Sequence, residues 1–226
     1  MKAERTIERL FRGEHTLIVA LGDSLTQGWM VRKGYLAFLE EMLGSLFPSA
    51  SFKILNRGIP GDTAEGGLMR VREDVIDEDP NCVLVQFALN DAFIGYPVER
   101  FRHNLQSIVD RIGENTDAEI ILLTSVHLVE SRDSATAAPF YDAIEKLGAA
   151  NGLPELFDRV VEGGGGGAVA IEKLGAANGL PVVRVHEYWR KKISEVAEFR
   201  GLVQPDMVHP TVEGYRLMAE AVMEVF

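Results

Sequence analysis

Cysteine is nearly absent from this sequence, which has one, Cys82, among 226 residues. A single cysteine cannot form an internal disulfide, so the class of disulfide-stapled folds is excluded. Cys82 opens the apolar run Cys82-Val83-Leu84-Val85. We therefore expect a buried core residue at this position and not a reactive thiol.

Basic residues are also scarce, with 23 Lys and Arg against 34 Asp and Glu, a formal net charge of −11. Phosphate backbones and anionic lipid headgroups repel such a chain, so we expect no nucleic-acid partner and no membrane partner. Residues 1–13 carry six charged side chains and no apolar stretch long enough for a signal peptide or a membrane span. These absences predict a cytoplasmic protein.

Recognisable metal and phosphate motifs are missing as well. The 5 histidines show no HExxH or comparable ligand spacing, which predicts that no metal is bound. The glycine run Gly163–Gly167 is not followed by Lys-Ser or Lys-Thr, so it is no phosphate-binding loop. It is instead typical of a flexible linker.

What the sequence does contain is the composition of an ordinary globular domain, with 46% hydrophobic and 25% charged residues. Short β-branched runs alternate with amphipathic stretches, which predicts a single α/β domain over residues 1–226 with a parallel sheet between helices. The expected strands are Thr16–Leu21, Phe52–Asn56, Cys82–Ala88, Ile120–Ser125 and Val182–Val185. The expected helices are Tyr35–Phe47, Thr63–Ile76, Val98–Ile112, Pro139–Ala150 and Pro210–Val225.

A duplication interrupts this pattern within residues 143–181. Residues 143–154 read AIEKLGAANGLP, and residues 170–181 repeat them without a change at an offset of 27. Two placements are open. If the first copy packs on the sheet, the extra residues lie in a helix-to-strand connection away from ligands; if the second packs, they follow the fourth strand and can act as a lid. An engineered duplication with a helix that exchanges between two positions, or an error in the sequence itself, would produce the same repeat.

Three residue types needed for nucleophilic catalysis occur at the two ends of the chain. Ser24 follows the first strand, which we expect to be central, and Asp206-Met207-Val208-His209-Pro210 precedes the last helix. A serine hydroxyl needs an adjacent base, and the base needs a carboxylate that fixes its tautomer. Each residue also has an ordinary alternative: a helix-capping serine, a helix-start carboxylate and a surface histidine.

Candidate donors to an oxyanion follow the next two strands. In the segment Asn56–Thr63, Gly58 can bring its backbone N–H close to a ligand because it has no side chain. After the third strand, the Asn90 amide can donate a second hydrogen bond. A turn glycine and a helix-capping Asn-Asp pair are the plain alternatives.

Taken together, these blocks make the chain resemble the SGNH hydrolases, also called GDSL esterases and lipases. Gly22-Asp23-Ser24-Leu25 matches the first block, the Asn56–Thr63 segment the second, Asn90-Asp91 the third and Asp206–Pro210 the last. The resemblance implies a flavodoxin-like three-layer α/β/α sandwich with no metal and no organic cofactor. It also implies that Ser24 is the nucleophile, His209 the base and Asp206 the orienting acid, with Ser24, Gly58 and Asn90 as oxyanion donors. One departure is Ala88, which stands where the third block usually has glycine.

We therefore expect a serine ester hydrolase that acts on small-molecule, short-chain carboxylic esters through an acyl-enzyme. A thioesterase, a carbohydrate deacetylase and a non-catalytic acyl-binding module are the alternatives. Trp29, Met30 and Phe93 follow the first and third blocks and are candidates for the acyl pocket, although apolar residues at these spacings are also typical of a core. Oligomeric state and physiological substrate leave no trace in the sequence.

Overall fold

A single parallel sheet forms the centre of the computed structural model, which describes residues 1–129, 131–151, 179–195 and 199–226. Its strands are β1 (Thr16–Gly22), β2 (Phe52–Gly58), β3 (Cys82–Gln86), β4 (Glu119–Leu123) and β5 (Val182–Val183). They pair in the order β2-β1-β3-β4-β5, and every neighbouring pair is parallel. The five-stranded α/β sheet predicted from the sequence is thereby confirmed.

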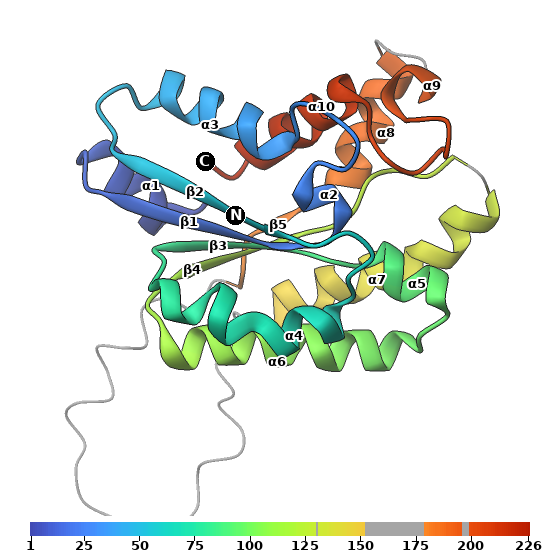
Figure 1. Cartoon of the computed structure of the whole chain (residues 1–226), viewed down its shortest axis with the longest axis horizontal. Coiled ribbons are helices and arrows are strands. Elements are labelled where there is room, and N and C mark those ends of the chain that lie inside the picture. Colours follow the sequence, from blue (N-terminus) through green and yellow to red (C-terminus); the bar gives the residue numbers. More distant parts are fainter. Residues whose placement is uncertain (130, 152–178, 196–198) are drawn as a thin grey trace, which may run out of the picture.

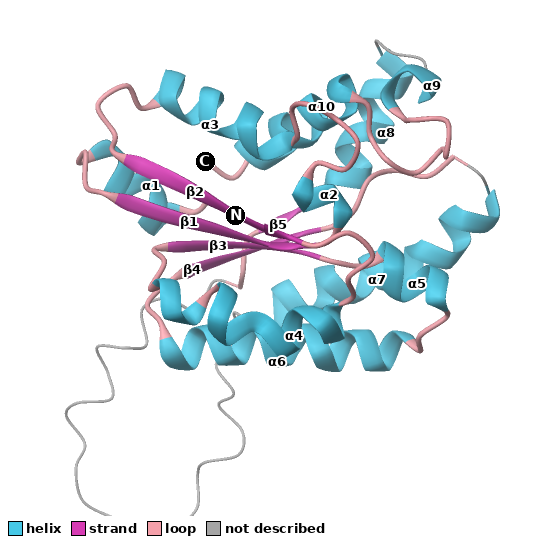
Figure 2. Ribbon diagram, viewed as in Figure 1, coloured by secondary structure: helices cyan, strands magenta, loops and turns pink. Residues whose placement is uncertain are grey.

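Helices cover both faces of this sheet and complete three layers (Figures 1 and 2). On one face lie α3 (Tyr35–Leu46), α8 (Val185–Glu195) and α10 (Val212–Met223). On the other lie α4 (Ala64–Asp74), α5 (Leu89–Ile94), α6 (Val98–Asn115) and α7 (Ser131–Ala150). The shorter elements are α1 (Glu4–Phe11), α2 (Ser24–Gln27), the 3₁₀ turn η1 (Ile76–Glu78) and α9 (Phe199–Leu202).

The inner strands β3 and β4 are apolar except at one end each, Gln86 and Glu119, because helices cover them on both sides. Every residue of β3 and β4 is buried, and Cys82 at the start of β3 is a free, buried thiol. Burial raises the pKa of Cys82 to about 12, so the thiol stays protonated. The expectation of a core cysteine is confirmed.

The strand order places the candidate site at a topological switch point. β1 lies between β2 and β3, so the chain turns one way after β1 and the other way after β2. In open α/β sheets this reversal opens a crevice at the carboxyl ends of the strands, where ligands bind. The prediction that the first strand is central is wrong in one respect: β1 is interior but adjoins the edge strand β2, and β3 is the middle strand.

β5 is shorter than the predicted Val182–Val185, because only two of its residues pair with β4. The N–H groups of Glu187 and Tyr188 both donate to the Arg184 carbonyl, and this turn starts α8 at Val185. The apolar residues on both sides of this boundary are buried, so hydrophobicity alone did not separate the strand from the helix.

The first copy of the duplicated segment packs on the sheet as the last turns of α7. Ala143, Ile144 and Leu147 are buried there, and the Gly148 carbonyl accepts a hydrogen bond at 2.9 Å from the N–H of Leu180. Residues 143–151 of the first copy read AIEKLGAAN, and residues 179–181 of the second copy read GLP. Together the two described parts amount to one complete AIEKLGAANGLP unit before β5. Residues 152–178, including the glycine run and most of the second copy, lie outside the described residues.

Candidate active site

Ser24 lies directly after β1, on the first turn of the short helix α2. The Asp23 carboxylate caps this helix by accepting a hydrogen bond from the Leu25 N–H at 2.9 Å, and Gly28 ends it with a left-handed φ of 84°. The backbone N–H of Ser24 is one of the first-turn donors that have no partner inside a helix. Ser24 itself is 7% exposed, so its hydroxyl faces a confined space.

His209 and Asp206 reach Ser24 from the loop between α9 and α10. The Nε2 atom of His209 lies 2.9 Å from the Ser24 Oγ, although 185 positions separate the two residues in the chain. The Nδ1 atom of His209 lies 2.6 Å from Oδ2 of Asp206. The structure thus brings the three predicted residues together in the order hydroxyl, imidazole, carboxylate.

The surroundings of Asp206 keep its carboxylate charged. Burial acts to raise its pKa, but hydrogen bonds from the backbone N–H groups of Val208 and His209 and from the His209 ring outweigh burial, so the pKa lies below its ordinary value. An ionised Asp206 accepts a hydrogen bond from Nδ1–H of His209, which fixes the tautomer and leaves Nε2 with a free lone pair toward Ser24. The arrangement can therefore move a proton from the serine hydroxyl to the imidazole.

Gln204, which the sequence did not single out, ties the histidine loop to the serine segment. Its side-chain amide donates to the carbonyls of Trp29 at 3.0 Å and of Pro210 at 2.9 Å. Its backbone N–H also donates to the His209 carbonyl at 2.7 Å. These hydrogen bonds join two segments that are far apart in the chain, and no local motif signals them.

A buried polar network lies beneath the serine. Gln86 at the end of β3 donates to Asp23 at 3.3 Å and to Ser125 at 3.1 Å, and it accepts a hydrogen bond from Thr26 at 3.0 Å. Complete burial raises the pKa of Asp23 to about 7, against the opposing hydrogen bonds from Leu25 and Gln86. This network fixes the turn that carries Ser24.

Asn90 lies in the first turn of α5, after β3. Its amide nitrogen donates to the Asp62 carbonyl at 2.7 Å, which uses one of the two amide hydrogens and leaves the other for a ligand. The neighbouring Asp91 is fully buried and accepts from the Ala64 N–H, and burial raises the pKa of Asp91 to about 6. These bonds join the loops after β2 and β3.

Gly58 does not offer the free N–H that the sequence analysis expected. Its N–H donates to the Asn56 side chain at 2.9 Å, and its Cα packs so closely on Gln27 that an added Cβ would lie 2.2 Å from the Gln27 nitrogen. Gly58 is thus a glycine because the backbones of β2 and α2 touch there. The next glycine of the same segment, Gly61, has a left-handed φ of 79°, and its N–H has no partner among the described residues.

A pocket of about 230 Å³ opens over the serine. It is lined by Asp23, Ser24, Leu25, Leu89, Asn90, Phe93, Asp206, Val208 and His209. Of the three predicted pocket residues only Phe93 lines it. Trp29 lies beside the His209 ring, with 6.3 Å between ring centroids, whereas Met30 is 75% exposed and takes no part in the wall. The apolar wall instead includes Leu25, Leu89 and Val208, which sequence spacing did not indicate.

Ala88, the departure from the usual third block, is fully buried just before α5. Its carbonyl accepts the N–H of Ala92 at 2.9 Å, so the residue starts the helix that carries Asn90. The extra methyl group is accommodated in the core at this point.

The described part of the chain contains neither a cluster of metal ligands nor a membrane-spanning helix. Among those residues, no three His, Cys, Asp or Glu side chains gather closely enough to hold a metal ion. Across the same residues, no helix is long and apolar enough to cross a bilayer.

A three-layer α/β/α sandwich with serine, histidine and aspartate joined at the switch point of its sheet defines a class of flavodoxin-like proteins with a serine-based site. Comparison with family models gives the more particular answer. The GDSL-like lipase/acylhydrolase family matches residues 20–217, and the chain belongs to this family. The resemblance noted in the sequence is confirmed.

Curated relatives are similar to parts of the chain. An arylesterase of Vibrio mimicus is 26% identical over 136 residues, 58% of this chain and 64% of the relative. The esterase TesA of Pseudomonas aeruginosa is 29% identical over 110 residues, 48% of this chain and 53% of that protein. The chain thus spans between half and two thirds of these relatives.

Solved structures share the fold over almost the full length. Axe2, an acetylxylan esterase from Geobacillus stearothermophilus, superimposes with a TM-score of 0.72 at 19% identity and covers 93% of both chains. At this identity the likeness is one of fold. It confirms the flavodoxin-like sandwich expected from the family.

Proposed function

We propose that this protein is a carboxylic ester hydrolase that acts on short-chain esters through an acyl-enzyme on Ser24. The observation that carries the proposal is the pair of contacts at His209, 2.9 Å to the Ser24 hydroxyl and 2.6 Å to the Asp206 carboxylate. Membership of the GDSL-like lipase/acylhydrolase family supports the same chemistry.

In the first half-reaction the Ser24 oxygen attacks the ester carbonyl carbon while His209 Nε2 takes the hydroxyl proton. Asp206 holds the proton on Nδ1 and stabilises the imidazolium that forms. Collapse of the tetrahedral intermediate expels the alcohol, which receives the proton from His209, and leaves Ser24 acylated. Water then repeats the sequence on the acyl-enzyme and releases the carboxylic acid.

For the oxyanion we propose the Ser24 N–H and the free amide hydrogen of Asn90 as donors, with the Gly61 N–H as a third donor in place of Gly58. Gly58 already donates to Asn56, whereas Gly61 adjoins Asp62, whose carbonyl holds the Asn90 amide. Each such donor is typically worth about 10²- to 10³-fold in rate.

The preference for short acyl chains follows from the size of the pocket. At about 230 Å³ it is smaller than the roughly 300 to 1,000 Å³ of typical small-molecule sites. The side chains of Leu89, Phe93 and Val208 stand on its wall, where a longer chain would have to pass. An acetyl or propionyl group fits this space.

A carbohydrate deacetylase is the second candidate, because an acetylated sugar is itself a short-chain ester. An acetylxylan esterase of Geobacillus stearothermophilus is among the relatives, 27% identical over 95 residues. Trp29 is 38% exposed beside His209, where its indole ring can stack on a sugar. The thioesterase alternative has no comparable feature in the structure.

The decisive experiment compares the wild-type protein with Ser24→Ala on p-nitrophenyl esters from acetate to palmitate, on acetylated xylo-oligosaccharides and on an acyl thioester. We expect turnover of the acetate, little of the palmitate, and a loss of about 10³-fold or more in kcat with Ser24→Ala. Mass spectrometry after a fluorophosphonate probe should show one adduct, on Ser24. Equal turnover by wild type and Ser24→Ala, or an unlabelled Ser24, would overturn the proposal and favour a binding module.

A further inference from the structure

Arg70 stands out because a cation is largely buried behind the active site. It lies on α4 with its side chain only 14% exposed. The guanidinium meets four acceptors: the Asp62 carboxylate at 2.8 Å, the Asp74 carboxylate, and the backbone carbonyls of Arg57 at 2.8 Å and Gly22 at 2.9 Å. Burying a charge is costly unless it is paired and fully hydrogen-bonded, and here it is.

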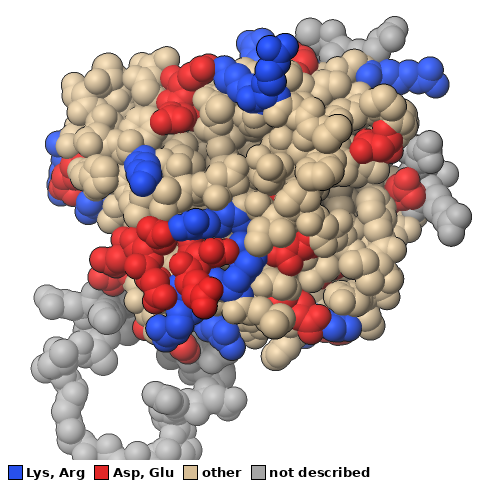
Figure 3. All heavy atoms as spheres, viewed as in Figure 1, with Lys and Arg blue, Asp and Glu red and all other residues tan. Residues whose placement is uncertain are grey.

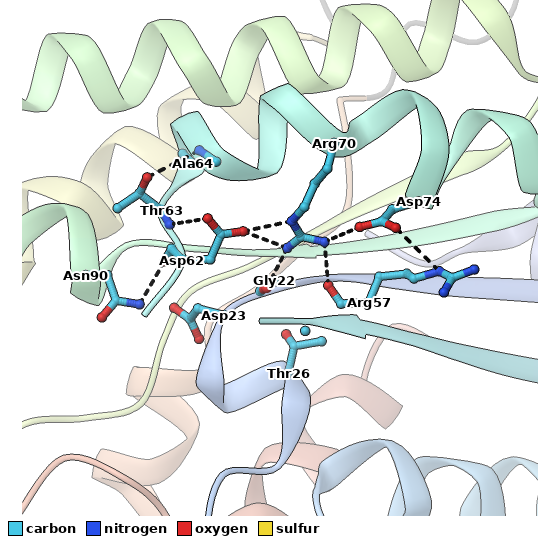
Figure 4. A network of polar contacts seen from close by, with 12 residues as sticks. Gly22, Asp23, Thr26, Arg57, Asp62, Thr63, Ala64, Arg70, Asp74 and Asn90 are labelled. Carbon is cyan, nitrogen blue, oxygen red and sulfur yellow. Dashed lines mark hydrogen bonds and ion pairs between the residues drawn. The ribbon is translucent and has the colours of Figure 1, made fainter. Parts of the chain in front are cut away.

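Three of the four acceptors of Arg70 belong to segments that surround the site, and the fourth, Asp74, lies at the end of α4 itself (Figure 4). Gly22 ends β1, two positions before Ser24, and Arg57 lies at the end of β2. Asp62 lies in the loop that leads into α4 and accepts the Asn90 amide on its carbonyl at 2.7 Å. One rigid, planar guanidinium therefore connects the strand that carries the serine to the loop that holds Asn90.

We propose that Arg70 is a positioning residue, which holds the Ser24 turn and the Asn90 amide at the separation that the reaction requires. The proposal rests on the ester hydrolase function proposed above. Arg70 acts through Gly22 on the serine turn and through Asp62 on Asn90. Catalytic geometry has a tolerance of about 0.5 Å, so a small shift of either segment lowers the rate.

The chemistry of the site explains why arginine is needed. All three nitrogens of the guanidinium take part in bonding the four acceptors, whereas an ammonium group offers only three donors from one point. Without the Arg70 cation, the Asp62 carboxylate, 13% exposed, loses its ion pair, and Asp74, 24% exposed, keeps only its pair with Arg57 at 3.9 Å. The loop that holds Asn90 then moves away from β1.

A merely structural role is the alternative, because α4 and the strand ends beside it carry many ion pairs. Figure 3 shows acidic and basic side chains gathered over this part of the surface. They include the pairs of Arg57 with Glu78 and of Arg72 with Asp77. Arg72 is the natural control, since it is on the same helix as Arg70 but is 68% exposed and has no contact with the loops of the site.

The test measures kcat, KM and the thermal midpoint for Arg70→Lys, Arg70→Gln, Arg72→Gln and Val71→Ala with p-nitrophenyl acetate. We expect Arg70→Gln to lower kcat by about 10- to 100-fold with KM within twofold of wild type, and Arg70→Lys to lie between. Arg72→Gln should leave kcat and the midpoint unchanged. Val71 is fully buried on α4, so Val71→Ala should lower the midpoint without lowering kcat.

A double-mutant cycle gives a readout that stability cannot imitate. In an Asn90→Ala background, Arg70→Lys should lower kcat by a factor smaller than in the wild type, because part of its effect passes through Asn90. The cycle uses Arg70→Lys and not Arg70→Gln, so it still tests the proposal if Arg70→Gln does not fold. Equal factors in both backgrounds, or a kcat of Arg70→Lys within twofold of wild type, would overturn the proposal. If the wild-type protein itself hydrolyses no ester, the proposed function fails and this proposal fails with it.

Discussion

The two edges of the parallel sheet differ in how much change each can accept. At the carboxyl edge, side chains and loop backbones are joined by buried hydrogen bonds around Ser24, from Asp23 and Gln86 on one side to Arg70 on the other. At the amino edge, the end of α7 lies beside the residues that lead into β5, and the Leu180 N–H donates to the Gly148 carbonyl there. The arrangement of the carboxyl edge depends on individual side chains. The amino edge contains a duplicated stretch, and the strands of the sheet keep their register.

Each edge of the sheet has a hollow, and the larger hollow is not the one that contains the serine. The amino edge has the wider hollow, about 730 Å³, between the beginning of α1, the start of β4 and residues 179–181. Among the described residues that line it there is no serine, cysteine or histidine. The smaller pocket of about 230 Å³ has the serine, the imidazole and the amide. Reactive chemistry follows the arrangement of polar groups and not the volume.

Among these predictions, removing the Asn90 amide at the carboxyl edge should have the largest effect on activity. We expect Asn90→Ala to lower kcat for p-nitrophenyl acetate by about 10²- to 10³-fold, because the oxyanion loses a side-chain donor. Steady-state kinetics measure the loss. Asn115→Ala is the control, since that exposed amide donates to the Arg111 carbonyl at the end of α6, far from the serine. A kcat of Asn90→Ala within threefold of wild type would rule out this donor.

Neutralising Asp23 should have an intermediate effect, which appears in stability as a function of pH. Burial raises the pKa of Asp23 from 3.8 to about 7, so between these values the folded protein keeps a proton that the unfolded chain releases. Stability must therefore fall as pH rises from about 4 to 7. We expect this contribution to be about 2 to 4 kcal/mol. In Asp23→Asn it should be absent, because asparagine caps the helix equally well and does not ionise.

Urea unfolding at pH 4, 5.5 and 7 measures the free energy of unfolding for both proteins. Asp77→Asn is the control for the same change of carboxylate to amide, because Asp77 is 56% exposed and lies on η1, outside the buried network around Asp23. Parallel curves for wild type and Asp23→Asn would show that Asp23 is ionised in the folded protein throughout this range.

Removing residues 152–178 should have the smallest effect on activity and stability. This deletion tests how much change the amino edge of the sheet accepts. We propose that these 27 residues are dispensable, because joining Asn151 to Gly179 restores one AIEKLGAANGLP unit whose two parts already share the hydrogen bond from Leu180 to Gly148. We expect kcat within twofold of wild type and a stability equal or up to about 2 kcal/mol higher, since a shorter connection costs less closure entropy. Thermal unfolding and ester turnover measure both. A marked loss of activity would show that the segment serves the site.

Most of the sheet could be predicted from the sequence because strands covered on both faces are continuous apolar runs. All five strands and four of the five expected helices begin within two residues of their predicted positions; the exception is α7, which starts at Ser131 and not at Pro139. The helices α1, α2, α5, α8 and α9 were missed. α5 has only six residues, and α8 begins two positions after the end of β5, with the single exposed residue Arg184 between them. Local periodicity carries no signal for such boundaries.

The site was less predictable where it depends on contacts between distant segments. Residue types and strand ends indicated Ser24, Asn90, Asp206 and His209 as candidates, and the structure joins Ser24, His209 and Asp206 by hydrogen bonds. They could not decide between two glycines of one segment, because the partner of the Gly58 N–H and the contact of its Cα with Gln27 exist only in three dimensions. Arg70 bonds to backbone carbonyls, which no sequence pattern records.

The connection before β5 divides the proposed catalytic groups between two stretches of polypeptide. Ser24 and Asn90 precede Asn151, whereas Asp206 and His209 follow Gly179. Two separately synthesised fragments, 1–151 and 179–226, would each hold half of the reactive groups and neither would be competent alone. Ester cleavage would then measure the reassembly of the two fragments. The junction between residues 151 and 179 is therefore a suitable site at which to divide the protein into a complementation pair.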